Sequence, residues 1–386
     1  MAHYTTIMNE LLHLIPRHRF ETIVNHYSGD RYVKRFNCWN QFTTLLYAQA
    51  SGKDSLREIE HSFAVNAERL YHLGLPQIKR STLADANKAR SYQIFEDMFY
   101  RFLERCKDVT PKHKFKFKNP LYTLDATVID LSIRAFPWAK FMAKKGALRL
   151  HYEFDHSGEI PSFLVITDAK QHEVTVTQKN FDIISDSIYC FDKGYLSYGW
   201  FRRINDAKAF FVTRARDNMR YKVIGQHDRP NKKGVLSDEI IALYGTVKSE
   251  DYPESLRLIR YHDKDTDKTL TFLTNNFRLS SMAIAHIYKA RWQIEIFFKW
   301  VKQNLKIKTF FGTSKNAVLT QIWVAMCYYL ALAYIKYQTR YRYSLYYLHR
   351  VIGETLLSRF SIIDLLRASE RILPKLKQDE YQYVFL

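Results

Sequence analysis

Apolar residues in the first quarter of the chain recur every three or four positions, the spacing that places them on one face of a helix. The pattern is clear at Leu11, Leu12 and Ile15, and again from Phe95 to Phe102. Glycine and proline residues divide the region into short helices. We therefore expect residues 1–110 to form an all-helical DNA-binding region that can include a helix-turn-helix reader. A solvated face of a helix bundle explains its basic residues equally well.

The sequence PKHKFKFKNP at residues 111–120 alternates basic and aromatic side chains between two prolines. This pattern predicts a basic linker to the next domain. Its lysines could follow a nucleic-acid backbone. A short amphipathic edge strand with solvated lysines accounts for the same pattern, and the sequence does not favour one over the other.

Segments typical of strands follow, rich in branched and aromatic residues and bounded by turn residues. They cover residues 121–133, 147–154, 161–168, 187–192 and 208–213, with a helical stretch near 198–205. The order predicts three antiparallel strands and then strand, helix and strand, which is an α/β arrangement. Residues 217–279 contain further short strands and predict a mostly β insertion.

A long helix is expected from about Ser280. At 100° per residue, its polar residues Tyr288, Arg291, Glu295 and Lys302 fall within about 60° of one another. A neighbouring stripe is apolar and consists of Ile287, Ile294, Phe298, Val301 and Leu305. The helix is therefore expected to hold Glu295 at the edge of a core and not in open solvent.

The chain is strongly basic, with 59 Lys and Arg against 39 Asp and Glu and a formal net charge of +20. A polyanion is the natural partner of such a chain, and nucleic acid is the first candidate. The basic residues are spread along the whole sequence, which argues against a membrane surface. The apolar segment Ile322 to Ile335 is short and flanked by Gln321 and Lys336, so we expect a buried core helix there.

The four cysteines are far apart, and each lies in an apolar or aromatic stretch, as expected of buried thiols in a reducing compartment. The N-terminus lacks the order of features of a signal peptide. Zinc-binding HExxH spacing, a GxxxxGK[ST] loop and a GxSxG elbow are also missing from the sequence. We expect a cytoplasmic protein whose chemistry uses neither zinc nor nucleotide hydrolysis.

The pattern Tyr-x2-Arg-x3-Glu-x6-Lys, formed by Tyr288, Arg291, Glu295 and Lys302, resembles the signature of insertion-sequence transposases of the IS-four family. These enzymes belong to the DDE class and have an RNase H-like catalytic core. The resemblance covers roughly residues 121–333. It implies a cut-and-paste DNA transposase that binds terminal inverted repeats, acts as a homodimer on double-stranded DNA and works near the bacterial nucleoid.

The resemblance also implies a catalytic triad of acids. Asp125 in the first strand and Asp192 at the end of the fourth would join Glu295 in holding two Mg²⁺ ions, for which Mn²⁺ can substitute. The rival acids nearby are Asp130, Asp155, Asp168 and Asp186. Asp130 is an odd number of residues from Asp125 and should face the other way. Asp168, at the end of the third strand, is the reserve candidate.

Roles for the other signature residues follow from the same resemblance. Tyr288, Arg291 and Lys302 would contact DNA near the transposon end, and Trp292 would help to hold a flipped base. The alternative for Arg291 is a surface charge paired with Glu295 one helical turn away. No Trp occurs between Phe201 and Arg291, so the insertion lacks the Trp that stacks on a flipped base in this family, and the hairpin route stays open.

We expect six parts: residues 1–110, the linker 111–120, core residues 121–216, the insertion 217–279, core residues 280–340 with the Glu295 helix, and C-terminal helices at 341–386. Two alternative functions remain. One is an RNase H-like metal-dependent nuclease that never joins strands, and the other is a non-catalytic DNA-binding protein descended from a transposase.

Overall fold

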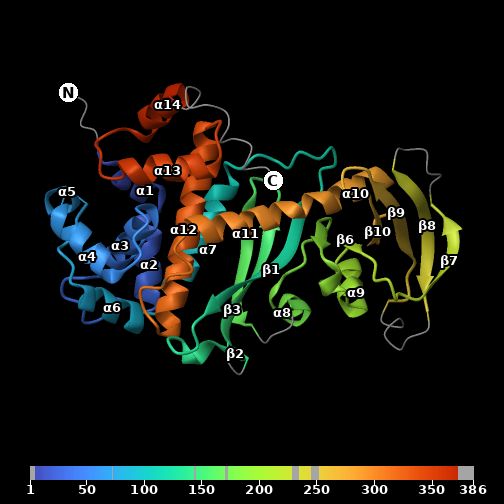
Figure 1. Cartoon of the computed structure of the whole chain (residues 1–386), viewed down its shortest axis with the longest axis horizontal. Helices are drawn as coiled ribbons and strands as arrows, with labels where there is room; N and C mark the ends of the chain where they lie inside the picture. The colour runs from blue at the N-terminus through green and yellow to red at the C-terminus, as the bar shows by residue number, and fades with distance from the viewer. Residues whose placement is uncertain are drawn as a thin grey trace. The chain divides into compact units, whose positions relative to one another are not determined.

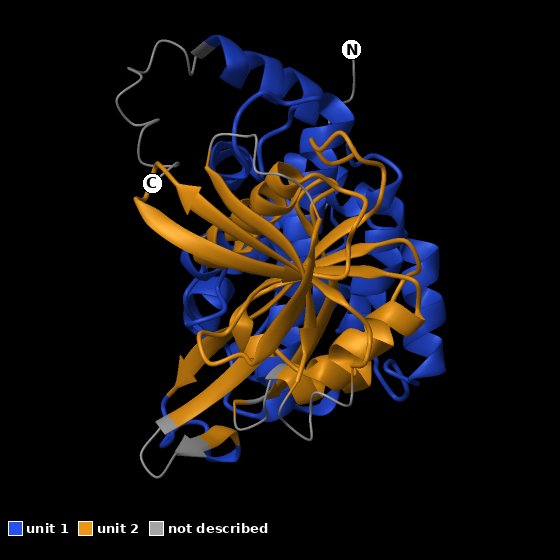
Figure 2. Cartoon of the chain, turned by 90° about the vertical axis from the view of Figure 1, so that its right-hand side faces the viewer, with its two compact units in different colours: residues 1–111, 132–138, 300–386 blue, residues 112–131, 139–299 orange. Residues whose placement is uncertain are grey.

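The computed structural model describes residues 5–71, 73–142, 145–169, 173–227, 234–244 and 252–372. The chain folds into two compact units, which Figure 2 shows in different colours. Unit 1 comprises Met1–Pro111, Ser132–Trp138 and Trp300–Leu386, and unit 2 comprises Lys112–Leu131 and Ala139–Lys299. The six-part division expected from the sequence is finer than these units and stays a prediction.

Unit 1 is helical in its described residues, as the spacing of apolar residues predicts for the N-terminal region. Its N-terminal helices are α1 (Ile7–Leu14), α2 (Arg17–His26), α3 (Cys38–Ala50), α4 (Leu56–Val65), α5 (Ala67–Tyr71), α6 (Arg80–Ala89) and α7 (Gln93–Lys107). Its C-terminal helices are α12 (Lys315–Thr339), α13 (Leu345–Thr355) and α14 (Ile362–Ile372), and a 3-10 turn, η1 (Pro137–Ala139), lies at a unit boundary.

Helix α12 forms the centre of unit 1, where it packs against α3, α6, α7 and α13 (Figure 1). In the described part of the chain it is the one helix long and apolar enough to cross a membrane, and 94% of its most apolar window is buried inside the protein. The apolar segment from Ile322 to Ile335 is therefore part of a longer core helix, and the expectation of a core helix is confirmed.

Unit 2 is built on one mixed sheet, which has ten strands in the described residues. They are β1 (Leu121–Leu131), β2 (Lys140–Met142), β3 (Lys145–Asp155), β4 (Ile160–Asp168), β5 (Ile188–Phe191), β6 (Phe210–Arg214), β7 (Tyr221–Gln226), β8 (Val235–Leu243), β9 (Leu256–Asp263) and β10 (Lys268–Thr274). The helical elements are α8 (Glu173–Asn180), the 3-10 turn η2 (Lys193–Tyr195), α9 (Tyr198–Asp206), α10 (Ser281–Ala290) and α11 (Trp292–Asn304), which ends in unit 1.

The pairing of the strands confirms the expected α/β class. Strands β1, β3 and β4 are antiparallel neighbours. Strands β5 and β6 then run parallel to β1, with α9 between them in the chain. Strand β10 pairs with β6, and β9, β8 and β7 follow it in antiparallel order. The strands within residues 217–279 therefore continue the same sheet.

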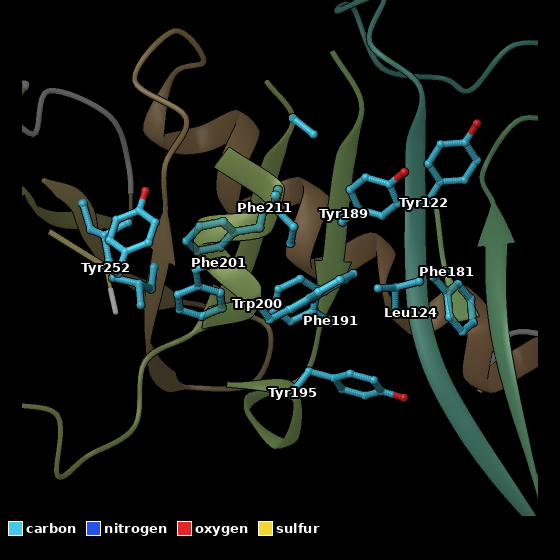
Figure 3. Packing of buried hydrophobic residues seen from close by; sticks show 14 of the residues in the cluster. Tyr122, Leu124, Phe181, Tyr189, Phe191, Tyr195, Trp200, Phe201, Phe211 and Tyr252 are labelled. Atoms are coloured by element: carbon cyan, nitrogen blue, oxygen red, sulfur yellow. The ribbon is translucent and has the colours of Figure 1, made fainter. Parts of the chain in front are cut away.

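Alternate residues of the central strands serve two separate cores. On one face, Trp200 and Phe201 of α9 pack with Phe191 and Phe211 (Figure 3). The rings of Phe201 and Phe211 are stacked, with centroids 4.1 Å apart. On the other face, Ile284 and Ile287 of α10 cover residues of β1, β5 and β6. The period of two thus decides which strand residues face α10.

The helix expected from Ser280 is interrupted at Arg291, so the expectation of one continuous helix is wrong. The N–H of Arg291 donates to Tyr288 O at 3.2 Å, and the N–H of Ile294 donates to Arg291 O at 3.1 Å. Both bonds span three residues, so a tightened turn separates α10 from α11. The predicted apolar stripe is still buried on both helices, from Ile287 to Leu305.

Candidate active site

Two of the predicted acids occupy matching positions on neighbouring parallel strands. The register of β1 and β5 runs from Leu121 opposite Ile188 to Leu124 opposite Phe191. Asp125 and Asp192 are the next residues of the two strands, which lie about 4.8 Å apart in a sheet. Leu121 and Ile188 belong to the core under α10, so the same alternation turns both acids toward that face.

Helix α11 brings the third acid to this face. Phe297 and Phe298 contact the ring of Tyr152, with centroids 5.2 and 5.4 Å away. Tyr152 of β3 lies directly opposite Asp125 of β1. The packing of two phenylalanines against the neighbour of Asp125 therefore holds the first turn of α11, with Glu295, beside that acid.

Arg291 links Asp125 and Glu295. Its Nη1 lies 2.8 Å from Asp125 Oδ2 and 3.5 Å from Glu295 Oε1. The side chains of Arg291 and Asp125 are 13% and 14% exposed, whereas that of Glu295 is 41% exposed. Arg291 is consequently no solvated surface charge, and Glu295 is the acid of this pair that is more open to solvent.

Tyr288 connects the same cluster to Asp192. Its hydroxyl donates to Asp192 Oδ1 at 3.1 Å, and its ring packs on Phe272 with centroids 5.1 Å apart. Burial raises the pKa of the Tyr288 hydroxyl, and the negative charge of Asp192 raises it further. Tyr288 is therefore a neutral donor that fixes the orientation of Asp192.

The charges around Arg291 show how closely the groups interact. Burial opposes its positive charge, but Asp125 and further neighbours outweigh that effect and raise its pKa.

Cys190, two residues before Asp192, is buried close to these charged groups. Burial raises the pKa of its thiol to about 12, with Asp125 and Asp192 adding to the rise. Cys190 is thus a packed, unreactive thiol, and all four cysteines are free and buried.

The remaining two predicted residues are placed differently. Trp292, the first residue of α11, is 61% exposed. Lys302 is half-buried in the last turn of α11, in the part of the helix that belongs to unit 1. Seven residues of helix separate it from Glu295, or about 10 Å. The structure therefore brings Tyr288 and Arg291 together with the three acids, and Trp292 is next to Arg291 in the chain.

The rival acids have other places. Asp130 is exposed, as its odd offset from Asp125 predicts. Asp155 Oδ1 accepts the N–H of Ser157 at 2.7 Å, and Asp186 Oδ1 accepts from Asn119 Nδ2 at 2.8 Å. Asp155 is the last residue of β3, and Asp186 lies in a turn before β5. The reserve candidate Asp168 ends β4, but its side chain lies outside the described residues.

The donor set suits a hard cation, since three carboxylates supply the oxygen ligands that divalent ions such as Mg²⁺ prefer. Across the residues that the structure describes, however, no group of three or more His, Cys, Asp and Glu side chains is arranged so that it could hold a metal ion. Arg291 lies between Asp125 and Glu295, and Tyr288 engages Asp192. The chemistry therefore fits such an ion, and Arg291 is the group that it would replace.

The sequence did not predict the contact between Arg291 and Asp125 or the role of Tyr152. Arg291 and Asp125 are 166 residues apart, and helical spacing indicates only the local pair with Glu295. Tyr152 reads as an ordinary strand aromatic until the register of β3 against β1 is known. Both depend on pairing between distant segments, for which a single sequence has no local signal.

Comparison with known families gives two matches. A family model described as the transposase DDE domain matches residues 116–331. A second model, described as a domain of unknown function (DUF4372), matches residues 3–76. The first match contains Asp125, Asp192 and Glu295 and extends into α12.

Similar proteins are named as transposases. The Sinorhizobium fredii protein y4zB, named as a transposase, is 36% identical to this chain over 254 residues, which are 65% of this chain and 69% of y4zB. A Geobacillus stearothermophilus protein, named as the transposase of insertion sequence element IS5377, is 25% identical over 76% of this chain and 80% of its own length. A Synechocystis protein, named as the transposase of element IS4SA, is 23% identical over 65% of this chain and 70% of its own length.

Among solved structures, a piggyBac transposase synaptic complex with hairpin DNA aligns with 97% of this chain and 82% of that chain. The TM-score is 0.45 at 11% sequence identity.

Proposed function

The chain belongs to the family defined by the transposase DDE domain, and we propose that Asp125, Asp192 and Glu295 are the acids that bind the metal ions in its active site. It is a DNA transposase, an enzyme that acts on DNA. The observation that carries the proposal is convergence. Asp125 and Glu295 contact the same guanidinium nitrogen, and Asp192 follows on the strand next to Asp125.

We also propose that unit 2 has an RNase H-like fold and that the chain is a member of the IS-four family. Three antiparallel strands followed by strand, helix and strand support the RNase H-like assignment. The gathering of Tyr288, Arg291 and Glu295 at one site supports the IS-four signature. One relative is also named for an element called IS4SA.

The family uses divalent metal ions, and we propose two Mg²⁺ ions here, for which Mn²⁺ can substitute. When bound, such ions activate water or a 3′-hydroxyl and stabilise the leaving oxygen. The carboxylates of Asp125, Asp192 and Glu295 would hold them. Of Asp125 and Glu295, the half-exposed Glu295 is the more accessible from solvent.

Arg291 and Tyr288 keep the acids in position. Arg291 neutralises part of the negative charge of Asp125 and Glu295, while Tyr288 orients Asp192. The Nε of Arg291 is buried and has no hydrogen-bond partner within the described structure. A buried donor left unsatisfied is unusual. The unsatisfied Nε supports a change of partner, in which the guanidinium of Arg291 leaves the carboxylates and binds a DNA phosphate.

We also propose that Trp292 and Lys302 contact DNA near the transposon end. A tryptophan that is 61% exposed next to the acids is available to stack on an unpaired base. Lys302 would act as a phosphate ligand further along α11.

The complete reaction that we propose is cut-and-paste transposition. The enzyme would bind terminal inverted repeats, cleave double-stranded DNA and join the ends to a target, as a homodimer in the bacterial cytoplasm at the nucleoid. The basic composition, with a formal net charge of +20, supports a DNA partner.

The test is incubation of the purified protein with donor DNA that carries its own flanking ends, with Mg²⁺ or with EDTA. We expect cleavage at the ends followed by joining, only with Mg²⁺. Asp192→Asn should abolish both, and Asp130→Asn, on the exposed side of β1, should not. Hydrolysis without joining would indicate a nuclease, and activity that survives Asp192→Asn would refute the assignment of the acids.

A further inference from the structure

Residues 112–118, named here the basic strip, form a regular pattern of charge in unit 2. Lys112, Lys114, Lys116 and Lys118 are exposed, whereas the aromatic residues between them are half-buried. Figure 1 shows this stretch in teal, between α7 and β1. The segment therefore exposes its four lysines while the aromatic residues between them are partly covered.

The aromatic residues anchor the strip. Phe115 and Phe117 are stacked, with centroids 5.1 Å apart, and pack against the core under α10. His113 Nδ1 accepts the N–H of Phe115 at 3.3 Å, so its Nε2 donates to Asn119 O at 2.8 Å. Asn119 in turn donates to Asp186. The backbone beneath the lysines is therefore held in place before any partner binds.

The lysines of the strip have no acidic partner. Over the ranges that the structure describes, no carboxylate lies within 4.0 Å of any of them, whereas Lys289 of the same unit pairs with Asp265 at 2.6 Å. Four like charges on an anchored segment repel one another. An external polyanion would relieve that repulsion at little cost in backbone ordering.

We propose that the basic strip binds the phosphate backbone of the transposon DNA, which rests on the proposed function of the chain. Phe115 and Phe117 are half-buried against the core under α10, so the exposed lysines are the groups that would make the contact. The contact is therefore electrostatic, independent of DNA sequence and sensitive to salt.

The position of the strip agrees with a role beside the active site. Strand β1 begins at Leu121, three residues after the strip, and reaches Asp125 roughly 13 Å later at 3.3 Å per residue. Both lie in unit 2. DNA whose cleaved phosphate is at Asp125 extends far beyond that distance on either side, so the strip can hold the same molecule.

The experiment compares two variants with the same loss of charge. One changes Lys112, Lys114, Lys116 and Lys118 to Gln. The control changes the exposed Lys179, Lys222, Lys264 and Lys268 of the same unit to Gln. Affinity for end-containing and unrelated duplexes is measured by fluorescence anisotropy over a range of salt concentrations, together with cleavage.

We expect the strip variant to lose at least about tenfold in affinity for both duplexes. Its plot of log affinity against log salt should be shallower by about 3.6, since each of the four phosphate contacts contributes about 0.9. The control should change much less. Equal effects of the two variants, or wild-type affinity of the strip variant for DNA, would overturn the proposal. Binding of the strip to anionic lipid vesicles in place of DNA would also overturn it. Failure of the wild-type protein to cleave DNA would instead count against the proposed function.

Discussion

Arg291 supplies the positive charge that allows Asp125 to be nearly buried. A carboxylate that is 14% exposed needs a charged or hydrogen-bonding partner, and Nη1 of Arg291 lies 2.8 Å away. The same nitrogen reaches Glu295 at 3.5 Å. A cation that enters between these acids competes directly with the guanidinium.

Arg291→Ala should therefore tighten Mg²⁺ binding by roughly tenfold or more, because a charge-assisted hydrogen bond worth about 1.5–3 kcal/mol no longer competes. The same variant should lose DNA cleavage, since its phosphate ligand is missing. Isothermal titration calorimetry with Mg²⁺ measures the first effect. Arg202→Ala, which breaks an exposed pair with Asp206, is the control. Weaker Mg²⁺ binding by Arg291→Ala would contradict the competition.

Trp292→Ala should weaken binding to transposon-end DNA that carries an unpaired base by about 1–3 kcal/mol, the usual contribution of one stacked base. Trp292→Phe should keep most of the affinity because it keeps an aromatic face. The comparison is Tyr244→Ala, which removes a 55% exposed aromatic after β8. A loss with Tyr244→Ala and none with Trp292→Ala would place the base contact in the insertion.

At the scale of elements, the start of α10 is held by a buried ion pair. The guanidinium of Arg257 is fully buried and binds both oxygens of Asp238, at 2.8 and 2.6 Å. Its Nη1 also donates to the carbonyls of Asn276 and Leu279, in the segment just before α10. This pair therefore fixes the entry of the helix that carries Tyr288.

Asp238→Asn should destabilise the protein by about 3–5 kcal/mol, because it leaves the charge of Arg257 buried without a counter-charge. Asp206→Asn removes the acid of an exposed pair and should cost no more than about 0.5 kcal/mol. Urea unfolding measures both. The double variant Asp238→Leu with Arg257→Met should recover much of the loss. Equal effects of the two single variants would show that burial does not control the energy of the pair.

The sequence predicted most elements of unit 2 but not their connections. Alternating branched and aromatic residues give β1, β3 and β4, and the apolar spacing near Tyr198 gives α9. The tightened turn at Arg291 was missed because Arg is a good helix former and nothing local marks the break. The pairing of β6 with β10, which joins the insertion to the main sheet, depends on contacts between distant segments. Arg291 contacts both Asp125 and Glu295, and its contact with Asp125 was not foreseen, while the roles of the acids stay a prediction.

At the scale of the whole molecule, stability should depend on pH through buried histidines. Burial lowers the pKa of His151 and of His156 to about 4, from the usual 6.5. The unfolded chain therefore binds protons below pH 6.5 that the folded chain excludes. Stability is complete above about pH 6.5 and is lost as the pH falls toward 4.

Each histidine should contribute a slope of up to about 1.4 kcal/mol per pH unit in that window. His156→Gln should flatten the dependence of the unfolding free energy on pH, measured by urea unfolding between pH 4 and 7. His286→Gln, at an exposed position of α10, should leave the slope unchanged. Identical slopes for the wild type and His156→Gln would show that His156 is not the source of the pH dependence.

Binding of Mn²⁺ followed by electron paramagnetic resonance tests the convergence of the three acids most directly. We expect Asp125→Asn, Asp192→Asn and Glu295→Gln each to weaken binding by more than the roughly 100-fold seen when groups that only support a metal ligand are removed. Asp130→Asn should bind Mn²⁺ like the wild type. If any of the three variants binds Mn²⁺ as the wild type does, the three acids do not form one metal site.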